Sequence, residues 1–443
     1  MSTKAIAVLL AGTLAAVGTL ARADDDLPFP SPATFTTRAV TPFAIEGLTG
    51  DDAGNVYTTG RQPNTALKCP VWRIAPEGTR VIVAFIPNSP ACNPSGITFD
   101  RIGNLYISDS AGPGTVWTVT PDRTGCAPLN DASNDSACSS VDANATATAY
   151  ATGVPGTNGL AFDRDGNLWT GDGTTGQGRV WRIKVHDGNC VVGPQNDNCK
   201  ELFRIQPMSN EVNLDALGVG GVGRDARSLP PGTITVTPSS RNAANTLGSQ
   251  ALVANGVAFN RDGDMYVADT ARGAIWKVAF DRDGVIRNRM GCDETFAANT
   301  LCLDSVFVAH PYLEGTDGIA LDRAGNIWNA ANERNAIVVV SKHGRVVEVF
   351  RNPVNPATNL RNDADTTETD AGRLAEARKH ILEFPTSPFL LGNTLCVAQS
   401  DGDRRDNSPR AAGEVNGGAG TKRGKISCLE QPLETPGLPL PVR

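Results

Sequence analysis

The stretch Asp163-Arg164-Asp165-Gly166-Asn167-Leu168-Trp169 contains the pattern Asp-x-x-Gly-Asn, followed closely by an aromatic residue. The pattern recurs along the chain. Copies or near-copies begin at Asp51, Asp100, Asp163, Asn260 and Asp322, and a degenerate sixth copy lies at residues 391–395. Internal repeats of this length are typical of folds in which each repeat is one structural unit. The chain is therefore predicted to contain six equivalent units.

The sequence around the fourth copy predicts four short strands. Apolar stretches at residues 255–259, 265–269 and 274–280 are separated by glycine-containing turns, and a fourth strand is expected near residues 305–309. Glycine supplies the positive φ that hairpin turns need, and alternating apolar residues are typical of half-buried strands. Four antiparallel strands per repeat, arranged in a ring, predict an all-β, six-bladed β-propeller.

Closure of the ring needs a strand from the other end of the chain. Residues 395–398 and 425–429 supply strands after the sixth copy, and a Pro-rich segment follows them. Residues 34–40 precede the first copy and have strand character. We expect them to form the outer strand of the sixth blade, which would join the two ends and leave no open gap in the ring.

The first 23 residues are predicted to be a secretory signal peptide. Lys4 precedes an apolar run over residues 5–20, and Ala21 and Ala23 place small side chains at positions −3 and −1 of a cleavage site. A membrane anchor is the alternative, but the run is short and three aspartates follow it directly. We expect cleavage after Ala23, one propeller domain over residues 24–443, and export to the periplasm or the cell exterior.

The charge of the chain argues against polyanionic partners. It has 40 Lys and Arg residues against 47 Asp and Glu, a net charge of −7 that becomes −9 when Lys4 and Arg22 are removed. An acidic protein is a poor ligand for nucleic acid or anionic membranes. We therefore expect neither as a partner, and the sequence leaves the oligomeric state open.

Ten cysteines predict disulfides between sequence neighbours, which are typical of exported proteins. The expected pairs are Cys69 with Cys92, Cys126 with Cys138, Cys190 with Cys199, Cys292 with Cys302, and Cys396 with Cys428. They flank turn-rich segments, so we expect them to clip the outer strands of successive repeats. Zinc binding is the weaker alternative, because no Cys-x-x-Cys pair occurs.

Two insertions interrupt the regular spacing of the copies. One covers about residues 206–254, and the second covers residues 352–383 with a helical candidate over residues 371–381. Each joins the last strand of one blade to the first strand of the next. Long loops on one face usually form lids or binding loops. Disordered ornament is the alternative, above all for residues 355–370.

The repeats also predict which side chains share one height around the axis. The residues nine positions before the Asn (or Asp264) that follows each Gly are Glu46, Ser95, Asn158, Asn255, Asp317 and Phe384. Two carboxylates converging on an axis repel each other and are costly to desolvate, and a divalent cation removes both problems. Two carboxylate and two amide donors suit Ca²⁺, with Mg²⁺, Mn²⁺ and Zn²⁺ as alternatives. The competing interpretation is that each residue only hydrogen-bonds a neighbouring loop.

Further side chains are expected around this position. The candidates for a substrate pocket are Ser95, Asp109, Asp172, Asp269, His310 and Phe384. The three aspartates end second strands, where they would contact a polar ligand or cap the next turn. The histidine lies seven residues before Asp317 and has either a proton-transfer or a structural role. A serine hydrolase is not expected, because the chain has no Gly-x-Ser-x-Gly motif.

The sequence resembles a known family in the segments that carry these residues. Glu46-Gly47, Asn158-Gly159, Asn255-Gly256 and Asp317-Gly318, each followed by its turn, are similar to the six-bladed superfamily of regucalcin (senescence marker protein), gluconolactonase and luciferin-regenerating enzyme. The resemblance covers residue 44 to about residue 350. It implies that Glu46, Asn255 and Asp317 bind the catalytic divalent metal, with Asn158 beside the metal or the substrate.

The resemblance implies a metal-dependent hydrolase that opens a lactone or cleaves a related ester. The metal would polarise the carbonyl group and water would attack it. Asp317 would act as general base as well as ligand, and Asn158 would orient the substrate. A non-catalytic propeller that binds a glycan or a protein is one alternative, and a lyase or synthase acting on a small natural product is another. Two acids aimed at one axis favour an enzyme over a scaffold.

Overall fold

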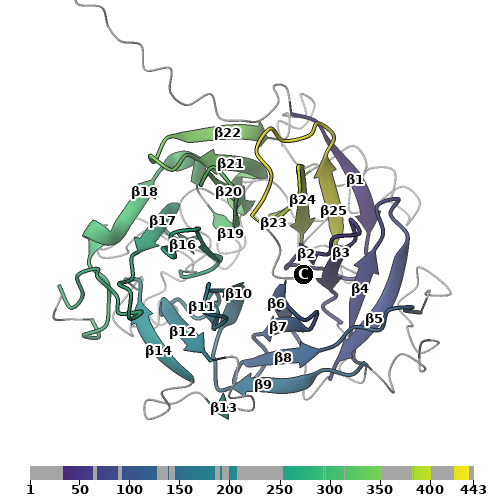
Figure 1. Cartoon of the computed structure of the whole chain (residues 1–443), viewed down its shortest axis with the longest axis horizontal. Helices are drawn as coiled ribbons and strands as arrows, with labels where there is room; N and C mark the ends of the chain where they lie inside the picture. The colour runs from purple at the N-terminus through teal and green to yellow at the C-terminus, as the bar shows by residue number, and fades with distance from the viewer. Residues whose placement is uncertain are drawn as a thin grey trace, which may run out of the picture.

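The computed structural model describes residues 33–62, 67–87, 92–126, 138, 145–184, 190–191, 199–206, 253–292, 294, 296–313, 315–351, 382, 384–400 and 424–438. These residues form six β-sheets arranged in a ring around a central axis (Figure 1). The helical elements in these ranges are three single 3₁₀ turns, η4 (Leu303–Ser305), η5 (Pro311–Leu313) and η6 (Asn332–Arg334). The predicted all-β, six-bladed propeller is therefore confirmed.

Each blade has its first strand nearest the axis and its last strand at the rim. Blade one contains β2 (Thr49–Gly50), β3 (Val56–Thr59), β4 (Cys69–Ile74) and β5 (Arg80–Ile86). Blade two contains β6 (Pro94–Phe99), β7 (Leu105–Asp109), β8 (Thr115–Val119) and β9 (Thr148–Thr152). Blade three contains β10 (Thr157–Phe162), β11 (Leu168–Asp172), β12 (Arg179–Ile183) and β14 (Cys199–Arg204).

The second half of the chain repeats this order. Blade four contains β15 (Val257–Phe259), β16 (Met265–Asp269), β17 (Ala274–Val278) and β18 (Val306–Ala309). Blade five contains β19 (Thr316–Leu321), β20 (Ile327–Ala331), β21 (Ala336–Val340) and β22 (Val346–Arg351). Blade six contains β23 (Pro385–Leu391), β24 (Thr394–Gln399), β25 (Lys425–Leu429) and β1 (Phe35–Val40). Neighbouring strands within all of these four-strand sets are antiparallel.

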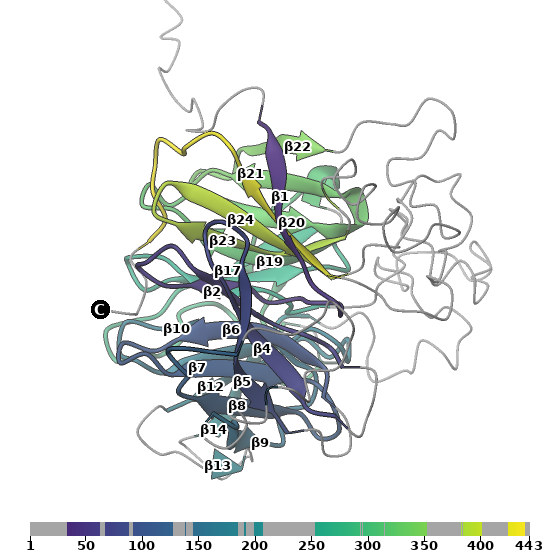
Figure 2. The same cartoon turned by 90° about the vertical axis from the view of Figure 1, so that its right-hand side faces the viewer.

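The N-terminal strand closes the ring as predicted. β1 pairs with β25 from Phe35 opposite Leu429 to Val40 opposite Lys425, and the two strands lie side by side in both views (Figures 1 and 2). The Phe35 side chain is buried and its ring lies 5.1 Å from that of Phe350 in blade five. The first described strand thus packs against the last two blades, which ties the ends of the ring together.

Blade two has one strand more than the prediction. Residues Cys190–Val191 form β13, which leaves the β12–β14 connection of blade three and pairs parallel with β9 of blade two. The connection therefore links two blades at the rim. This contact joins residues that are distant in sequence, and the repeat pattern does not predict it.

Four of the predicted disulfides are present. They join Cys69 to Cys92, Cys126 to Cys138, Cys292 to Cys302, and Cys396 to Cys428. Cys199 is also disulfide-bonded, and the side chain of its predicted partner Cys190 lies outside the described residues. The Cys396–Cys428 bridge differs from the expectation for outer strands, because it joins directly opposed residues of the middle strands β24 and β25.

The Asp of each complete repeat is the acceptor that holds its turn together. In blade five, Asp322 Oδ1 accepts hydrogen bonds from the backbone N–H groups of Ala324 and Asn326, both at 2.9 Å. Its Oδ2 accepts from Asn326 Nδ2 at 2.8 Å and from Trp328 Nε1 at 3.1 Å. The aromatic residue after each turn therefore has a polar function as well as an apolar one, which the sequence analysis did not predict.

The same arrangement occurs at Asp51, Asp100 and Asp163, with Tyr57, Tyr106 and Trp169 as the aromatic donors. Burial and the charge of Asp100 raise the pKa of Tyr106 to about 12, so the phenol stays protonated and donates a hydrogen bond to Asp100. In the fourth copy Asn260 replaces the Asp, and its Oδ1 still accepts from the backbone of Asp264 at 2.9 Å.

The two predicted insertions lie between β14 and β15 and between β22 and β23. Nearly all their residues are outside the described ranges, as are residues 1–32. The signal peptide and the helical candidate over residues 371–381 therefore stay predictions. Among the described residues, no helix is long and apolar enough to cross a membrane.

Replacement of Asp322 tests the turn. Asp322→Ala removes the buried acceptor of four hydrogen bonds and leaves their donors unpaired. We therefore expect the free energy of unfolding to fall by about 3 kcal/mol. Asp322→Asn keeps one acceptor oxygen, as Asn260 does in the fourth copy, and should lose less. Urea denaturation measures both, with the exposed Asp304→Ala as control. A loss below 1 kcal/mol for Asp322→Ala would contradict this role.

Candidate functional site

The six side chains predicted to share one height do begin the innermost strands. Glu46, Ser95, Asn158, Asn255, Asp317 and Phe384 each lie at or within three residues of the start of a first strand, and all are buried. We call this set the first ring. Since each first strand runs from this ring to an Asp-x-x-Gly-Asn turn, the ring and the turns lie at opposite faces of the propeller.

Main-chain contact between blades explains the glycine that follows each first-ring residue in blades one to five. A Cβ atom on Gly96 would lie 2.2 Å from the carbonyl oxygen of Asn158 in the next blade, and one on Gly256 would lie 2.4 Å from that of Asp317. The Gly256 N–H also donates to the Asp317 carbonyl at 3.0 Å. Inner strands thus pack backbone to backbone, which only glycine permits.

A second set of residues lies at the ends of the second strands, and four of its members contact first-ring residues of the same blade. These residues stand fifteen positions after their first-ring partners and form the second ring: Arg61, Ser110, Gly173, Thr270, Asn332 and Gln399. Asn332 Nδ2 donates to Asp317 Oδ2 at 2.9 Å, and Asn255 Nδ2 donates to Thr270 Oγ1 at 3.1 Å. Gly173 has no side chain and makes room for that of Asn158. The repeat spacing, counted forward by six, would have identified this ring.

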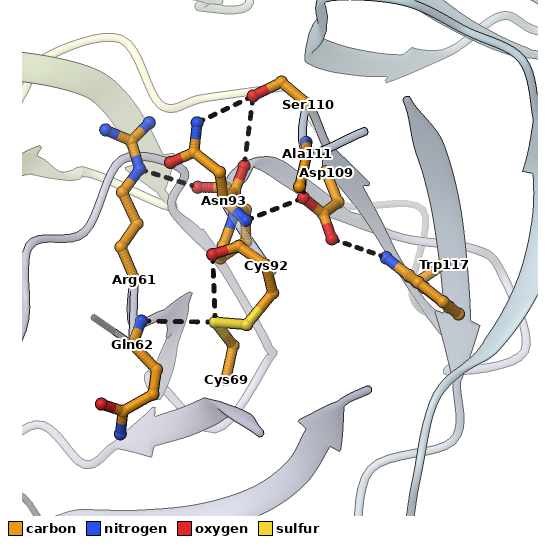
Figure 3. Close-up of a disulfide and its surroundings, with 10 residues drawn as sticks. Arg61, Gln62, Cys69, Cys92, Asn93, Asp109, Ser110, Ala111 and Trp117 are labelled. Carbon is orange, nitrogen blue, oxygen red and sulfur yellow. Dashed lines mark hydrogen bonds between the residues drawn. A yellow bond between two sulfur atoms is a disulfide. The ribbon is translucent and has the colours of Figure 1, made fainter. Parts of the chain in front are cut away.

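Arg61 is the charged member of the second ring and was not predicted from the sequence. Its guanidinium group forms an ion pair with the Glu46 carboxylate. Arg61 Nε donates to the Pro94 carbonyl at 3.2 Å, and Nη2 lies 3.4 Å from Ser95 Oγ. Its neighbour Gln62 donates its backbone N–H to Sγ of Cys69, which is bonded to Cys92 (Figure 3). The disulfide therefore anchors the segment that carries Arg61.

Asp317 is buried away from water, and its pKa is raised to about 7 by burial. The hydrogen bond from Asn332, the positive charge of Arg61 and the nearby Asn255 amide oppose this shift without cancelling it. The two acids of the first ring therefore differ. Glu46 has a direct cationic partner, whereas Asp317 has amide donors and a more distant positive charge.

The Asn255 carbonyl oxygen is the buried polar atom of this site that lacks a partner. Its Oδ1 has no hydrogen bond within the described part of the chain. The orientation of the amide follows from Thr270, whose hydroxyl donates to the Thr316 carbonyl at 2.6 Å and so must accept from Asn255 Nδ2. A buried acceptor without a donor is costly. Such an oxygen is able to accept a hydrogen bond or to coordinate a cation.

The three aspartates predicted at the pocket are buried and bind the turns after their strands. Asp109 accepts from Ala111 N in the turn and from Trp117 Nε1, both at 3.0 Å. Asp172 accepts from Thr175 N and from Arg179 Nε, both at 2.9 Å. Asp269 accepts from Arg272 Nη1 at 2.9 Å and Trp276 Nε1 at 3.0 Å. These contacts correspond to the turn-capping alternative, and burial raises the pKa of Asp109.

Two more of the pocket candidates, His310 and Phe384, lie in different surroundings, and the third, Ser95, lies beside Arg61. His310 follows the outer strand β18, where Nδ1 accepts from Tyr312 N at 3.0 Å and its ring packs 4.7 Å from that of Tyr312. Phe384 is buried in the first ring with a positive φ of 55°, and its N–H donates to Asn335 Oδ1 at 2.7 Å. The structure therefore places Phe384 in the ring and His310 at the rim of blade four.

The donor set of the first ring is compatible with a hard cation. Asp317, Asn255 and Glu46 offer only oxygen donors, as Ca²⁺ prefers, and the partnerless Asn255 oxygen and the desolvated Asp317 carboxylate would both gain from a positive charge. Within the described residues there is no cluster of three or more His, Cys, Asp or Glu side chains that could hold a metal. Any metal here would thus depend on amide as well as carboxylate oxygens.

A separate cavity of about 240 Å³ lies at the opposite face, between blades three and four. Trp169, Phe259 and Phe280 form its apolar wall, and Asp and Arg side chains of the turns surround it. It shares no residue with either ring and is therefore distinct from the candidate site.

Comparisons with known proteins agree with this architecture. The model of the family described as SMP-30/gluconolactonase/LRE-like region matches residues 185–361, so the predicted resemblance is confirmed there. The chain matches none of the curated proteins.

Three solved structures are similar over nearly the whole chain. A luciferin-regenerating enzyme is 13% identical with a TM-score of 0.50, and the match covers 93% of this chain and 99% of that one. The PQQ-bound aldose sugar dehydrogenase from Streptomyces coelicolor is 11% identical with a TM-score of 0.50, covering 90% and 99%. Regucalcin from Agrobacterium tumefaciens is 14% identical with a TM-score of 0.48, covering 93% and 97%. At these identities the first two matches support the fold and leave the reaction undecided.

The raised pKa of Asp317 predicts how stability changes with pH in metal-free protein. Because the folded protein holds this proton more tightly than the unfolded chain, Asp317 stabilises the fold at low pH and that contribution is lost as pH rises through about 7. We expect wild type to lose up to about 1.4 kcal/mol per pH unit relative to Asp317→Asn within the range pH 4–7.

Urea denaturation in chelator at pH 4.5, 5.5, 6.5 and 7.5 measures the difference. The comparison of wild type with Asp317→Asn removes the contribution of other titrating groups such as Asp109. Parallel curves for the two proteins would show that Asp317 titrates in its ordinary range.

Proposed function

We propose that this protein is a metal-dependent hydrolase that opens a lactone or cleaves a related ester. The observation that carries the proposal is the buried Asp317 carboxylate beside Asn255, whose side-chain oxygen Oδ1 lacks a hydrogen-bond partner. A second acid, Glu46, lies in the same ring. Buried acids and orphan acceptors are costly to maintain, and they concentrate at sites with a function. The family match over residues 185–361 favours a lactonase-type reaction.

Glu46, Asn255 and Asp317 would hold the cation, with Asn158 beside it. Ca²⁺ fits the all-oxygen donors best. When bound, the cation supplies Lewis-acid polarisation of the substrate carbonyl. Asp317 would accept the proton of the attacking water, and Asn332 keeps its carboxylate oriented through the 2.9 Å hydrogen bond to Oδ2.

The side chains around these residues would bind and orient the substrate. The Asn158 side chain lies against Gly173 and occupies the place that a second-ring side chain would take, and its amide would orient the substrate. Phe384 provides an apolar surface in the same ring. A small molecule with one carbonyl group and one apolar portion suits this combination.

A propeller that binds a glycan or a protein without catalysis is the main alternative. Such a scaffold gains nothing from two acids in its inner ring, where desolvation is unfavourable. A lyase or synthase would use the same pocket and differs only in substrate. Export to an oxidising compartment belongs to the proposal too, supported by the four disulfides and the predicted signal peptide.

Two substitutions test the metal and the reaction together. We expect Asp317→Ala and Glu46→Gln to lose bound metal and to reduce hydrolysis at least hundredfold, because each removes an anionic ligand. Metal analysis of the purified protein and a panel of lactones and aryl esters, with and without chelator, give the two readouts. Asp304→Asn, an exposed acid on blade four, should keep wild-type values.

The outcomes distinguish the candidate functions. Full hydrolysis in chelator-treated protein would exclude the metal-dependent mechanism. Bound metal with no turnover of any lactone or ester would favour the lyase, synthase or scaffold.

A further inference from the structure

Glu46 already has a cation as its partner. Arg61, which follows the second strand of the same blade, pairs with the Glu46 carboxylate inside the ring, where Glu46 is 9% exposed and Arg61 28% exposed at the side chain. A carboxylate so enclosed interacts strongly with any charge beside it, because water screens the interaction poorly. The predicted metal ligand is thus neutralised by the protein itself.

This ion pair differs from the other ion pairs at the same face. Arg179 and Arg272 bind Asp172 and Asp269, which are turn-capping residues outside the first ring. The second-ring residues that contact Asn255 and Asp317 are the uncharged Thr270 and Asn332. Among the described second-ring residues, Arg61 is therefore the charged one, and it lies against the first acid of the ring.

Arg61 and a divalent cation are mutually exclusive partners of Glu46. Both need the same carboxylate oxygens, and a guanidinium group beside a divalent cation adds like-charge repulsion in a poorly screened place. The Pro94 carbonyl and the Ser95 hydroxyl hold the guanidinium group near Glu46, and the neighbouring Cys69–Cys92 disulfide anchors the Arg61 segment. A cation that binds Glu46 has to break these contacts, and their loss weakens cation binding.

We propose that Arg61 is an internal counter-cation that competes with the divalent cation for Glu46 and so weakens metal binding at this site. With Glu46 and Asp317 ionised, the three groups carry a net charge of −1 without metal. The pair with Arg61 keeps the ring compact in that state. The metal can bind Glu46 only after Arg61 has left it. The affinity for the metal is therefore set by the difference between the free energy of the metal–Glu46 contact and that of the Arg61–Glu46 ion pair. The inference rests on the metal site of the proposed function.

Calcium titration of the chelator-stripped full chain tests the competition. We compare wild type, Arg61→Met and Arg61→Lys by isothermal calorimetry, with Ca²⁺ alone as the probe and melting temperature as a second readout. Arg61→Met keeps much of the aliphatic stem and removes the charge, so it should bind Ca²⁺ at least tenfold more tightly. Arg61→Lys keeps the charge and should stay within threefold of wild type. Arg73→Met, on β4 of the same blade, is the matched control.

A second background assigns the effect to Glu46. Glu46→Gln is expected to bind Ca²⁺ only weakly, so this background is titrated at high Ca²⁺ concentration. There Arg61→Met should tighten binding less than it does in the wild-type background, because the shared carboxylate is gone and only the charge repulsion is relieved. Unchanged or weaker Ca²⁺ binding by Arg61→Met in the wild-type background overturns the competition. If Arg61→Met does not fold, tighter binding by Arg61→Lys overturns the proposal and binding within threefold of wild type supports it.

Failure of the metal site itself gives a different result. If neither wild type nor Arg61→Met binds Ca²⁺, the proposed metal site fails and the competition fails with it. If only Arg61→Met binds, the competition is supported in its strongest form.

Discussion

The arrangement of this protein depends on the contact between the main chains of neighbouring inner strands. Where Gly96 meets the carbonyl of Asn158, and Gly256 that of Asp317, there is no room for a Cβ atom. Thr386 makes the corresponding closure in blade six, where its hydroxyl donates to the Glu46 carbonyl at 2.8 Å. This packing brings the first ring close enough for side chains of different blades to share one environment.

The close packing has an electrostatic consequence. Inner strands that touch exclude water, so acids placed there are desolvated, and each has to be stabilised by a neighbour. Glu46 is stabilised by Arg61 and Asp317 by Asn332, both from the ends of second strands. The second ring thus sets the surroundings of both first-ring acids. Each of these pairs lies within one blade, and the ring brings the pairs of different blades together around the axis.

Much of this could be predicted because the repeats are regular. The Asp-x-x-Gly-Asn turns located the hairpins and the residues that begin the inner strands, since local turn chemistry is carried by a few adjacent residues. The outer strand of blade six was predicted at residues 34–40 from its strand character and the need to close the ring. Arg61 was missed although the same count, made forward, reaches it. β13 was missed for a different reason: its pairing with β9 depends on how a rim connection crosses to another blade, and such contacts follow no period.

The sequence by itself determined the number of blades, the disulfide partners now observed and the residues that begin the inner strands. These features are local, and each is repeated, so one copy supports the interpretation of the others. Only the tertiary structure decided the partners of the buried charges. Whether Glu46 meets a guanidinium group and Asn255 keeps an unpaired oxygen depends on distances across strands and on which atoms water can reach. Neither quantity is encoded in the spacing of residues along the chain.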